Sequence, residues 1–206
     1  MASDPKTDAS LIVPRTRPSL IWLGIAAILI AMALWRFLPL ALSPTPAIGG
    51  PFALTDTAGH RVTNSELLGK PYAVFFGYTH CPDVCPTTLQ DMSGWLKSLG
   101  PDADKVRLVF VTVDPDRDTP PVLADYMKSF DPRILALTGS QSDLEKTEAA
   151  FRVYAKKGEV KNGEYAMDHT AAIYLMDRSG VFRSVLSLDE KPEAAVARLK
   201  ELIGAA

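Results

Sequence analysis

The fold class is indicated most clearly by the stretch of residues 72–114, YAVFFGYTHCPDVCPTTLQDMSGWLKSLGPDADKVRLVFVTVD. Its two ends, 72–78 and 106–114, are nearly continuous apolar runs, which are typical of strands buried on both faces. Between them, apolar residues recur at helical spacing from Leu89 to Leu99 before a glycine ends the pattern. This order predicts a strand, a helix and a second strand, and therefore a parallel pair of strands within the sheet.

The sequence on either side predicts further elements of the same domain. They are a hairpin at 52–63, a helix capped by Thr119, a strand at 134–139, a helix capped by Ser142, a polar loop at 158–168, a hairpin at 170–188 and a helix at 191–204. Residues 51–206 are therefore expected to form an α/β domain with a thioredoxin-like fold, in which helices cover a central mixed sheet.

Composition excludes several classes of protein. The 206 residues carry 22 Lys and Arg against 24 Asp and Glu, and this balance argues against a basic nucleic-acid binder. The chain has 2 cysteines, which are too few for a disulfide scaffold, so Cys81 and Cys85 are interpreted as one pair.

Residues 18–35, PSLIWLGIAAILIAMALW, contain no charge and lie between Arg17 and Arg36. As a helix this segment would be roughly 27 Å long, close to the thickness of the hydrocarbon core of a bilayer. Basic residues precede it, whereas no charge follows Arg36 until Asp56, so the positive-inside rule puts the N-terminus in the cytoplasm. A cleaved signal peptide is the alternative.

These features predict four regions. They are a cytoplasmic tail at 1–17, a transmembrane anchor at 18–36, a Pro/Gly-rich linker at 37–50 and the folded domain at 51–206, outside the cytoplasm.

The cysteine pair lies just past the end of the first long strand, and a proline follows each cysteine. Because proline disfavours helical geometry in the residue before it, neither cysteine is expected inside a regular helix. Pro86 suits the first helical position, which makes Cys85 the expected N-cap and predicts a lowered pKa for its thiol near the helix dipole. Packing in a core and a structural disulfide are the alternatives, but a bridge across so short a loop stabilises little.

A metal site would need a further ligand beyond the two thiolates. His60 falls in the first hairpin and His80 adjoins Cys81, where neighbouring side chains point to opposite sides. His169 is the preferred ligand. It lies where the polar loop enters the strand predicted after it, and a thioredoxin-like layout brings the start of that strand to the loop that holds Cys81 and Cys85. Met167 is a weaker candidate ligand, and Asp168 a candidate for orienting the site.

Two thiolates and one imidazole form a soft ligand set, for which copper is the natural ion. Three ligands suit Cu(I), and Cu(II) could add a water. Zinc accepts the same set with water in the fourth position, so the ligand types alone leave both metals open.

The segments FGYTHCPDVCPTTL (76–89), FVTVDPDRDTP (110–120) and DHTAAIYLMD (168–177) closely resemble the Sco (SenC) family of copper chaperones. The resemblance implies a thioredoxin-like fold, copper ligands at Cys81, Cys85 and His169, and delivery of copper to the CuA centre in subunit II of cytochrome c oxidase. An upstream periplasmic copper donor and a thiol reductant are expected partners of such a chaperone. Together with the charge pattern around residues 18–35, the resemblance predicts a single-pass location in a bacterial inner membrane with the domain facing the periplasm.

Other functions share some of these residues. The main alternative is a thiol-disulfide oxidoreductase that reduces the CuA-site cysteines through Cys81 and Cys85; otherwise no enzymatic activity is expected. A peroxiredoxin-type peroxidase would have a threonine three residues before the attacking cysteine, where this chain has Tyr78. Copper-responsive signalling is a fourth interpretation. The acidic loop at 114–120 is explained either by partner recognition or by capping of the next helix.

Overall fold

The computed structural model describes residues 20–41 and 47–205. The chain divides into two compact units, Met1–Thr45 and Pro46–Ala206. The tail expected at 1–17 and residues 42–46 of the expected linker lie outside the described residues.

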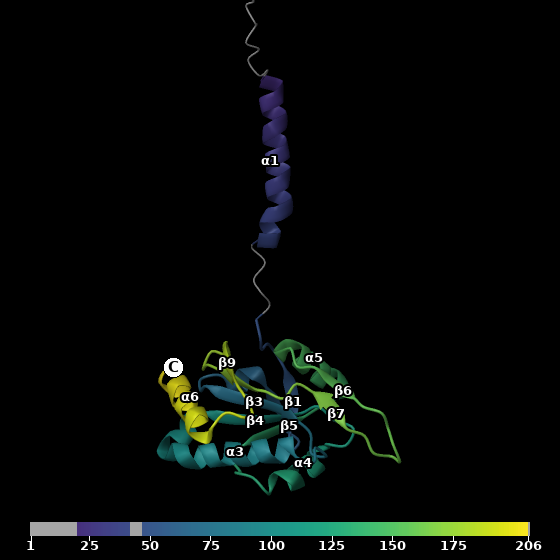
Figure 1. Ribbon diagram of the computed structural model, residues 1–206, viewed down its shortest axis with the longest axis vertical. Helices are drawn as coiled ribbons and strands as arrows, with labels where there is room; N and C mark the ends of the chain where they lie inside the picture. The colour runs from purple at the N-terminus through teal and green to yellow at the C-terminus, as the bar shows by residue number, and fades with distance from the viewer. Residues whose placement is uncertain (1–19, 42–46, 206) are drawn as a thin grey trace, which may run out of the picture. The chain divides into compact units, whose positions relative to one another are not determined.

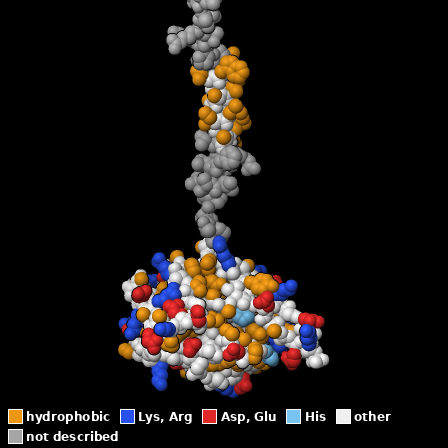
Figure 2. Space-filling view, in the orientation of Figure 1, with side chains coloured by type: hydrophobic (Ala, Val, Ile, Leu, Met, Phe, Trp, Pro, Cys, Tyr) orange, Lys and Arg blue, Asp and Glu red, His pale blue; other side chains and the backbone are white. Residues whose placement is uncertain are grey.

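In the first unit, α1 (Leu20–Ala41) is longer at its C-terminal end than the boundary predicted at residue 36. Apolar side chains such as Ile21, Trp22 and Ile28 are exposed along it (Figure 2). Among the helices in the described part of the chain, none meets the length and apolar character that a membrane crossing requires.

The second unit is built on a seven-stranded sheet with the order β2-β1-β5-β4-β3-β8-β9. Its strands are β1 (Ala53–Asp56), β2 (Arg61–Thr63), β3 (Tyr72–Gly77), β4 (Arg107–Thr112), β5 (Leu135–Thr138), β8 (Ile173–Met176) and β9 (Phe182–Leu186). β3 pairs in parallel with β4, and β4 with β5, whereas the remaining pairs are antiparallel. The register between β8 and β9 is interrupted at Leu175 and Met176.

The centre of the sheet is the most deeply buried part of the molecule. All residues of β3 and β8 are buried, as are all residues of β4 except Arg107. Continuous burial on both faces explains why β3 and β4 are apolar runs without alternation. The α/β class, the central mixed sheet and the parallel pair at its middle, as the sequence predicted, are confirmed.

Helices cover both faces of this sheet. They are α2 (Asn64–Leu67), α3 (Val84–Leu99), the 3-10 helix η1 (Gly100–Lys105), α4 (Pro120–Met127), α5 (Gln141–Phe151) and α6 (Pro192–Gly204). α3 packs against α6, α4 against β5, and α5 against β1. Figure 1 shows α3, α4 and α6 on one side of the sheet and α5 on the other. Because β3 and β4 are parallel, their C-terminal ends lie at the same end of the sheet, and so do the connections that follow them. Ligands of open α/β sheets usually bind at this end.

Two local predictions for this unit need correction. The N-cap of α5 is Ser140, whose hydroxyl accepts a hydrogen bond from the Asp143 N–H at 3.1 Å, and not Ser142. The segment expected as a polar loop, 158–168, belongs to a hairpin: residues 158–166 connect β6 (Ala155–Lys157) to β7 (Met167–His169), and 167–168 are part of β7. The two strands form a second sheet. Thr119 is the N-cap residue of α4, as predicted, although its side chain makes no capping hydrogen bond.

Candidate metal centre

The segment that carries both cysteines, residues 78–85, follows the buried end of β3 and runs into the first turn of α3; we call it the cysteine loop. Cys81 closes a turn by donating its N–H to the Tyr78 carbonyl at 3.3 Å, and Cys85 lies in the first turn of α3. Gly77, the last residue of β3, leaves room for the second sulfur: a Cβ at this position would lie 2.9 Å from Cys85 Sγ. The backbone at the end of β3 therefore helps to fix where the inner thiol lies.

Cys85 is inside the helix, and the prediction that it is the N-cap is wrong. α3 begins at Val84 with Asp83 as its N-cap, so Pro86 lies in the first turn. Proline is tolerated there because the N–H groups of the first turn have no partner within the helix. Cys85, the residue before Pro86, is therefore helical despite the usual preference of such residues for extended geometry.

The two thiols have opposite surroundings, and both are free. Burial raises the pKa of Cys81, but backbone N–H groups of Asp83, Val84 and Cys85 point at its sulfur and lower the pKa below the usual range. Burial raises the pKa of Cys85 far above its usual value, and the charge of Cys81 acts in the same direction. The lowered pKa predicted for Cys85 is therefore wrong: of the two thiols, Cys81 has the lowered pKa.

His169 reaches the cysteine loop from β7. Its Nε2 lies 4.0 Å from Cys85 Sγ, and its ring makes an edge-to-face contact with Tyr78 at a centroid distance of 5.7 Å. Burial lowers the pKa of His169, which favours the neutral imidazole that binds metals. Nδ1 lies 3.1 Å from the Thr170 carbonyl, which can only accept a hydrogen bond. The proton therefore belongs on Nδ1, and the Nε2 lone pair faces the sulfur.

The strand that carries His169 belongs to a long hairpin, residues 155–169, which we call the histidine arm. At its tip, Asn162 and Gly163 both have positive φ, of 54° and 86°, and Lys161 and Glu164 pair across the turn. An Asn-Gly pair with this geometry is the preferred two-residue hairpin turn. This signal was present in the sequence, and it could have identified the arm in place of a loop.

The other candidate residues lie in different environments. His60 is 77% exposed and contacts Asp56 in the β1–β2 hairpin, away from the cysteines. His80 Nδ1 lies 3.0 Å from Thr79 Oγ1. Met167 is partly buried against the core, and Asp168 is exposed, with a charge that favours protonation of its neighbour His169.

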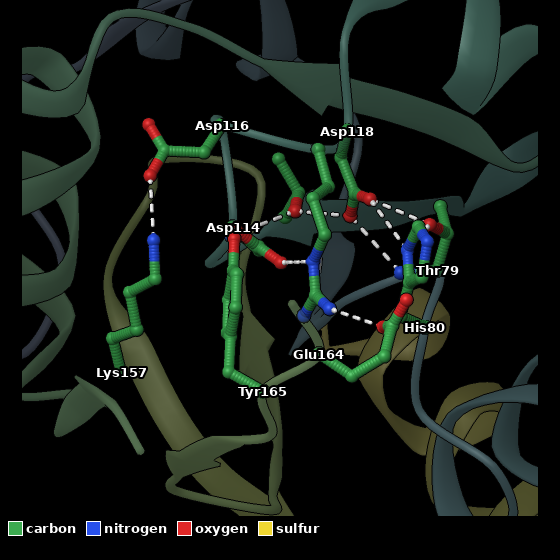
Figure 3. Close-up of polar contacts among 10 residues, drawn as sticks. Thr79, His80, Asp114, Asp116, Asp118, Lys157, Glu164 and Tyr165 are labelled. Atoms are coloured by element: carbon green, nitrogen blue, oxygen red, sulfur yellow. Dashed lines mark hydrogen bonds and ion pairs between the residues drawn. The ribbon is translucent and has the colours of Figure 1, made fainter. Parts of the chain in front are cut away.

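Sequence reasoning did not assign the residues that support the cysteine loop. Asp118, which is 0% exposed, accepts hydrogen bonds from Thr79 N at 2.9 Å, Thr79 Oγ1 at 2.5 Å and Thr112 Oγ1 at 2.5 Å (Figure 3). It belongs to the connection after β4, residues 114–118, which we call the bracket loop. Asp114 of the bracket loop is also buried. Among the acidic residues of this loop, Asp116 alone is exposed, with 65% of its side chain accessible to solvent. Two of the three carboxylates thus act inside the fold.

Two thiols and an imidazole are donors that suit a soft metal ion. Among the described residues, no group of three or more His, Cys, Asp or Glu side chains is close enough to hold a metal ion without some movement. Thiolate and imidazole bonds to a first-row metal are about 2.3 and 2.0 Å long, which sum to about 4.3 Å. One ion could therefore touch Cys85 and His169 at close to their present separation of 4.0 Å. Cys81 Sγ, 3.5 Å from Cys85 N, is the nearby second thiol.

Comparison with known proteins supports this fold. Residues 41–204 match the family model described as SCO1/SenC. The mitochondrial protein SCO2 of Saccharomyces cerevisiae is 36% identical over 162 residues, which are 77% of this chain and 54% of the relative. The chain thus spans about half the length of that relative.

Two solved structures extend the comparison. Copper-bound ScoI of Bradyrhizobium japonicum is 54% identical, with a TM-score of 0.72 over 76% of this chain and 99% of that one. Copper-bound Sco1 of yeast is 36% identical, with a TM-score of 0.73 over 78% of this chain and 91% of that one. With the family model covering most of the sequence, this chain belongs to the SCO1/SenC family.

Proposed function

We propose that this protein is a membrane-anchored copper chaperone that binds one copper ion through Cys81, Cys85 and His169 and delivers it to the CuA centre of cytochrome c oxidase subunit II. The observation that carries the proposal is the approach of His169 Nε2 to Cys85 Sγ at 4.0 Å, between residues 84 positions apart. Two similar proteins, those of Bradyrhizobium japonicum and yeast, have been solved with copper bound. The oxidase as recipient is what the family resemblance implies.

The chemistry of the three donors suits a carrier. Thiolates and imidazole are soft ligands that select copper over hard cations. Cys85 must lose its proton when metal binds, so its high pKa makes copper binding release a proton and weaken as pH falls. Cys81 is partly exposed and has the lower pKa, so it is the donor that a copper source or a recipient would reach first.

The location in the membrane rests on the N-terminal sequence. Residues 18–35 carry no charge, and basic residues precede them. The positive-inside rule then puts the domain on the outer face of the bacterial inner membrane, in the periplasm. An upstream copper donor and a thiol reductant in that compartment complete the proposal, since exported cysteines are prone to oxidation.

The experiment that tests the proposal is copper titration of the full-length chain in detergent, with the cysteines first reduced and then oxidised to the disulfide. One copper per chain is expected, bound tightly only in the reduced state. His169→Ala should remove the high-affinity binding, whereas the matched control His60→Ala, in the exposed first hairpin, should bind as the wild type does. Unchanged affinity in His169→Ala would refute the ligand assignment.

A thiol-disulfide oxidoreductase is the second candidate, and the difference between the two cysteines favours it. The Cys81 thiolate would attack a partner disulfide to form a mixed disulfide, and Cys85 would then displace the partner's thiolate. The Cys81–Cys85 pair is oxidised by two electrons, and the partner disulfide is reduced to two thiols. Reduction of an oxidised CuA-site peptide by the His169→Ala variant at the wild-type rate would support this activity.

A further inference from the structure

Tyr165 joins the histidine arm to the bracket loop, although it is not one of the proposed copper ligands. The Arg117 Cζ lies 3.6 Å and the Lys157 Nζ 3.9 Å from the centroid of its ring. The Tyr165 hydroxyl donates a hydrogen bond to Asp114 Oδ1 at 2.7 Å. Figure 3 shows Tyr165 beside Lys157, with the Asp114 carboxylate at the end of the ring. One side chain of the arm is therefore held by three residues at once.

Arg117 and Asp114 complete this contact from the bracket loop. Arg117 Nε donates to Asp114 Oδ2 at 2.5 Å, so each carboxylate oxygen of Asp114 has its own donor. The side chains of Arg117 and Asp114 are 16% and 3% exposed. Because both charges are largely shielded from water, the cation–π and hydrogen-bonding contacts are stronger than they would be at the surface. We call Asp114, Arg117 and Tyr165 the latch.

The histidine arm depends on such side-chain contacts for its position. β6 and β7 form their own sheet and share no ladder with the seven strands of the described main sheet. His169 contacts Tyr78 through its ring, and Arg117 lies 5.8 Å from the centroid of the same Tyr78 ring. Tyr165 precedes His169 by four residues on the returning side of the arm.

The bracket loop also contacts the other half of the site. Asp118, next to Arg117, accepts hydrogen bonds from Thr79, two residues before Cys81. A single short loop thus holds the segment that carries the cysteines at one end and the arm that carries the histidine at the other. A displacement of either contact would change the distance between His169 and Cys85.

We propose that the latch fixes His169 opposite the cysteine pair, and that Tyr165 and Arg117 are positioning residues for copper. The proposal rests on the copper-binding function proposed above. A ligand held in place before binding loses less conformational freedom when the metal arrives, which increases affinity without adding a contact to the ion. Without the latch, the packing of Ala155 and Met167 against the core would still hold the base of the arm, but the metal would have to do more of the positioning of His169.

The test compares the substitution of a tyrosine on the arm with that of Tyr154, which directly precedes the arm, in the full-length reduced chain. Tyr165→Leu removes the ring contacts and the hydroxyl, whereas Tyr154→Leu, the matched control, changes a side chain that is 53% exposed. Competition with a chromophoric Cu(I) chelator should show affinity about 10-fold weaker for Tyr165→Leu, equivalent to about 1.4 kcal/mol, and nearly unchanged for the control. Tyr165→Phe, which keeps the ring, should recover part of the loss.

A double-mutant cycle separates positioning from general damage to the fold. In the His169→Ala background, the weaker Cu(I) binding that remains at the two thiolates should not change further when Tyr165→Leu is added. An equal loss in both backgrounds, or wild-type affinity of Tyr165→Leu, would refute the latch. If His169→Ala alone binds copper as the wild type does, it is the proposed function that fails, whatever Tyr165→Leu does.

Discussion

Replacement of Asp118 by alanine is expected to be among the most damaging single changes outside the copper ligands. The carboxylate is fully buried and accepts hydrogen bonds from Thr79 N, Thr79 Oγ1 and Thr112 Oγ1. Asp118→Ala removes all three bonds and leaves a cavity at the base of the cysteine loop. The Thr79 and Thr112 hydroxyls can rotate, but the Thr79 N–H is fixed by the backbone and loses its partner.

The magnitude follows from these contacts. Hydrogen bonds to a charged group contribute about 1.5–3 kcal/mol each, and a buried donor without a partner costs about 1–3 kcal/mol. Because the lost bonds share one acceptor and the hydroxyls relax, the total is not a simple sum. We expect Asp118→Ala to lower the free energy of unfolding by about 3–5 kcal/mol, in line with the loss of one partner from other buried charged networks.

The assay is equilibrium unfolding of the reduced full-length chain in urea, followed by tryptophan fluorescence. Asp118→Asn keeps the shape and one acceptor oxygen, so its loss should be smaller, about 1–2 kcal/mol. Asp116→Ala is the matched control in the same loop: its carboxylate is 65% exposed and pairs with Lys157, so the change should stay within about 0.5 kcal/mol. A loss below about 1 kcal/mol in Asp118→Ala would show that the bracket loop does not support the cysteine loop as argued.

Three further predictions concern the thiols and a half-buried carboxyl. Gly77→Ala would place a Cβ 2.8 Å from the Phe110 ring and 2.9 Å from the Cys85 sulfur, so both side chains must shift. Copper binding, measured by chelator competition, should weaken about 10-fold or more, and wild-type affinity would contradict this. Iodoacetamide should alkylate Cys81 before Cys85, because the pKa of Cys81 is lowered and that of Cys85 is raised. The rate at Cys81 should rise with pH through a midpoint below that of an ordinary thiol. Peptide mass spectrometry would measure the order, and the reverse order would contradict the prediction. Burial, with a smaller effect of the Glu145 charge, raises the pKa of Glu148 to about 7, so the folded state favours the protonated form and stability falls as pH rises from about 4.5 towards 7. Glu148→Gln should therefore raise the Tm by a few degrees at pH 8 and change it little at pH 5, and equal shifts at both pH values would refute the assignment.

The part of the fold that sequence predicted well depends on local patterns. The runs that became β3 and β4 are apolar because both of their faces are buried, and Thr119 precedes a proline at the start of α4, so neither needs information from elsewhere in the chain. The start of α3 was misjudged because the rule for residues before proline was weighed above the freedom of a helix's first turn.

The part that sequence missed depends on contacts between distant segments. Tyr165 and Asp114 are 51 residues apart, and their hydrogen bond exists only because the histidine arm folds back over the bracket loop. No periodicity marks such a contact. The arm itself had a local signal in Asn162 and Gly163, but its short, polar strands lacked the apolar alternation that identifies a hairpin.

The two borders of the main sheet have a consequence for how the protein meets other molecules. β2 has only 3 residues, and the pairing of β9 with β8 is interrupted between Leu175 and Met176. Long, regular borders invite a strand from another chain, whereas short or bulged ones discourage it. The partly exposed Cys81 lies at one end of the sheet, whereas the short and bulged borders make pairing with a strand of another chain unfavourable along its sides.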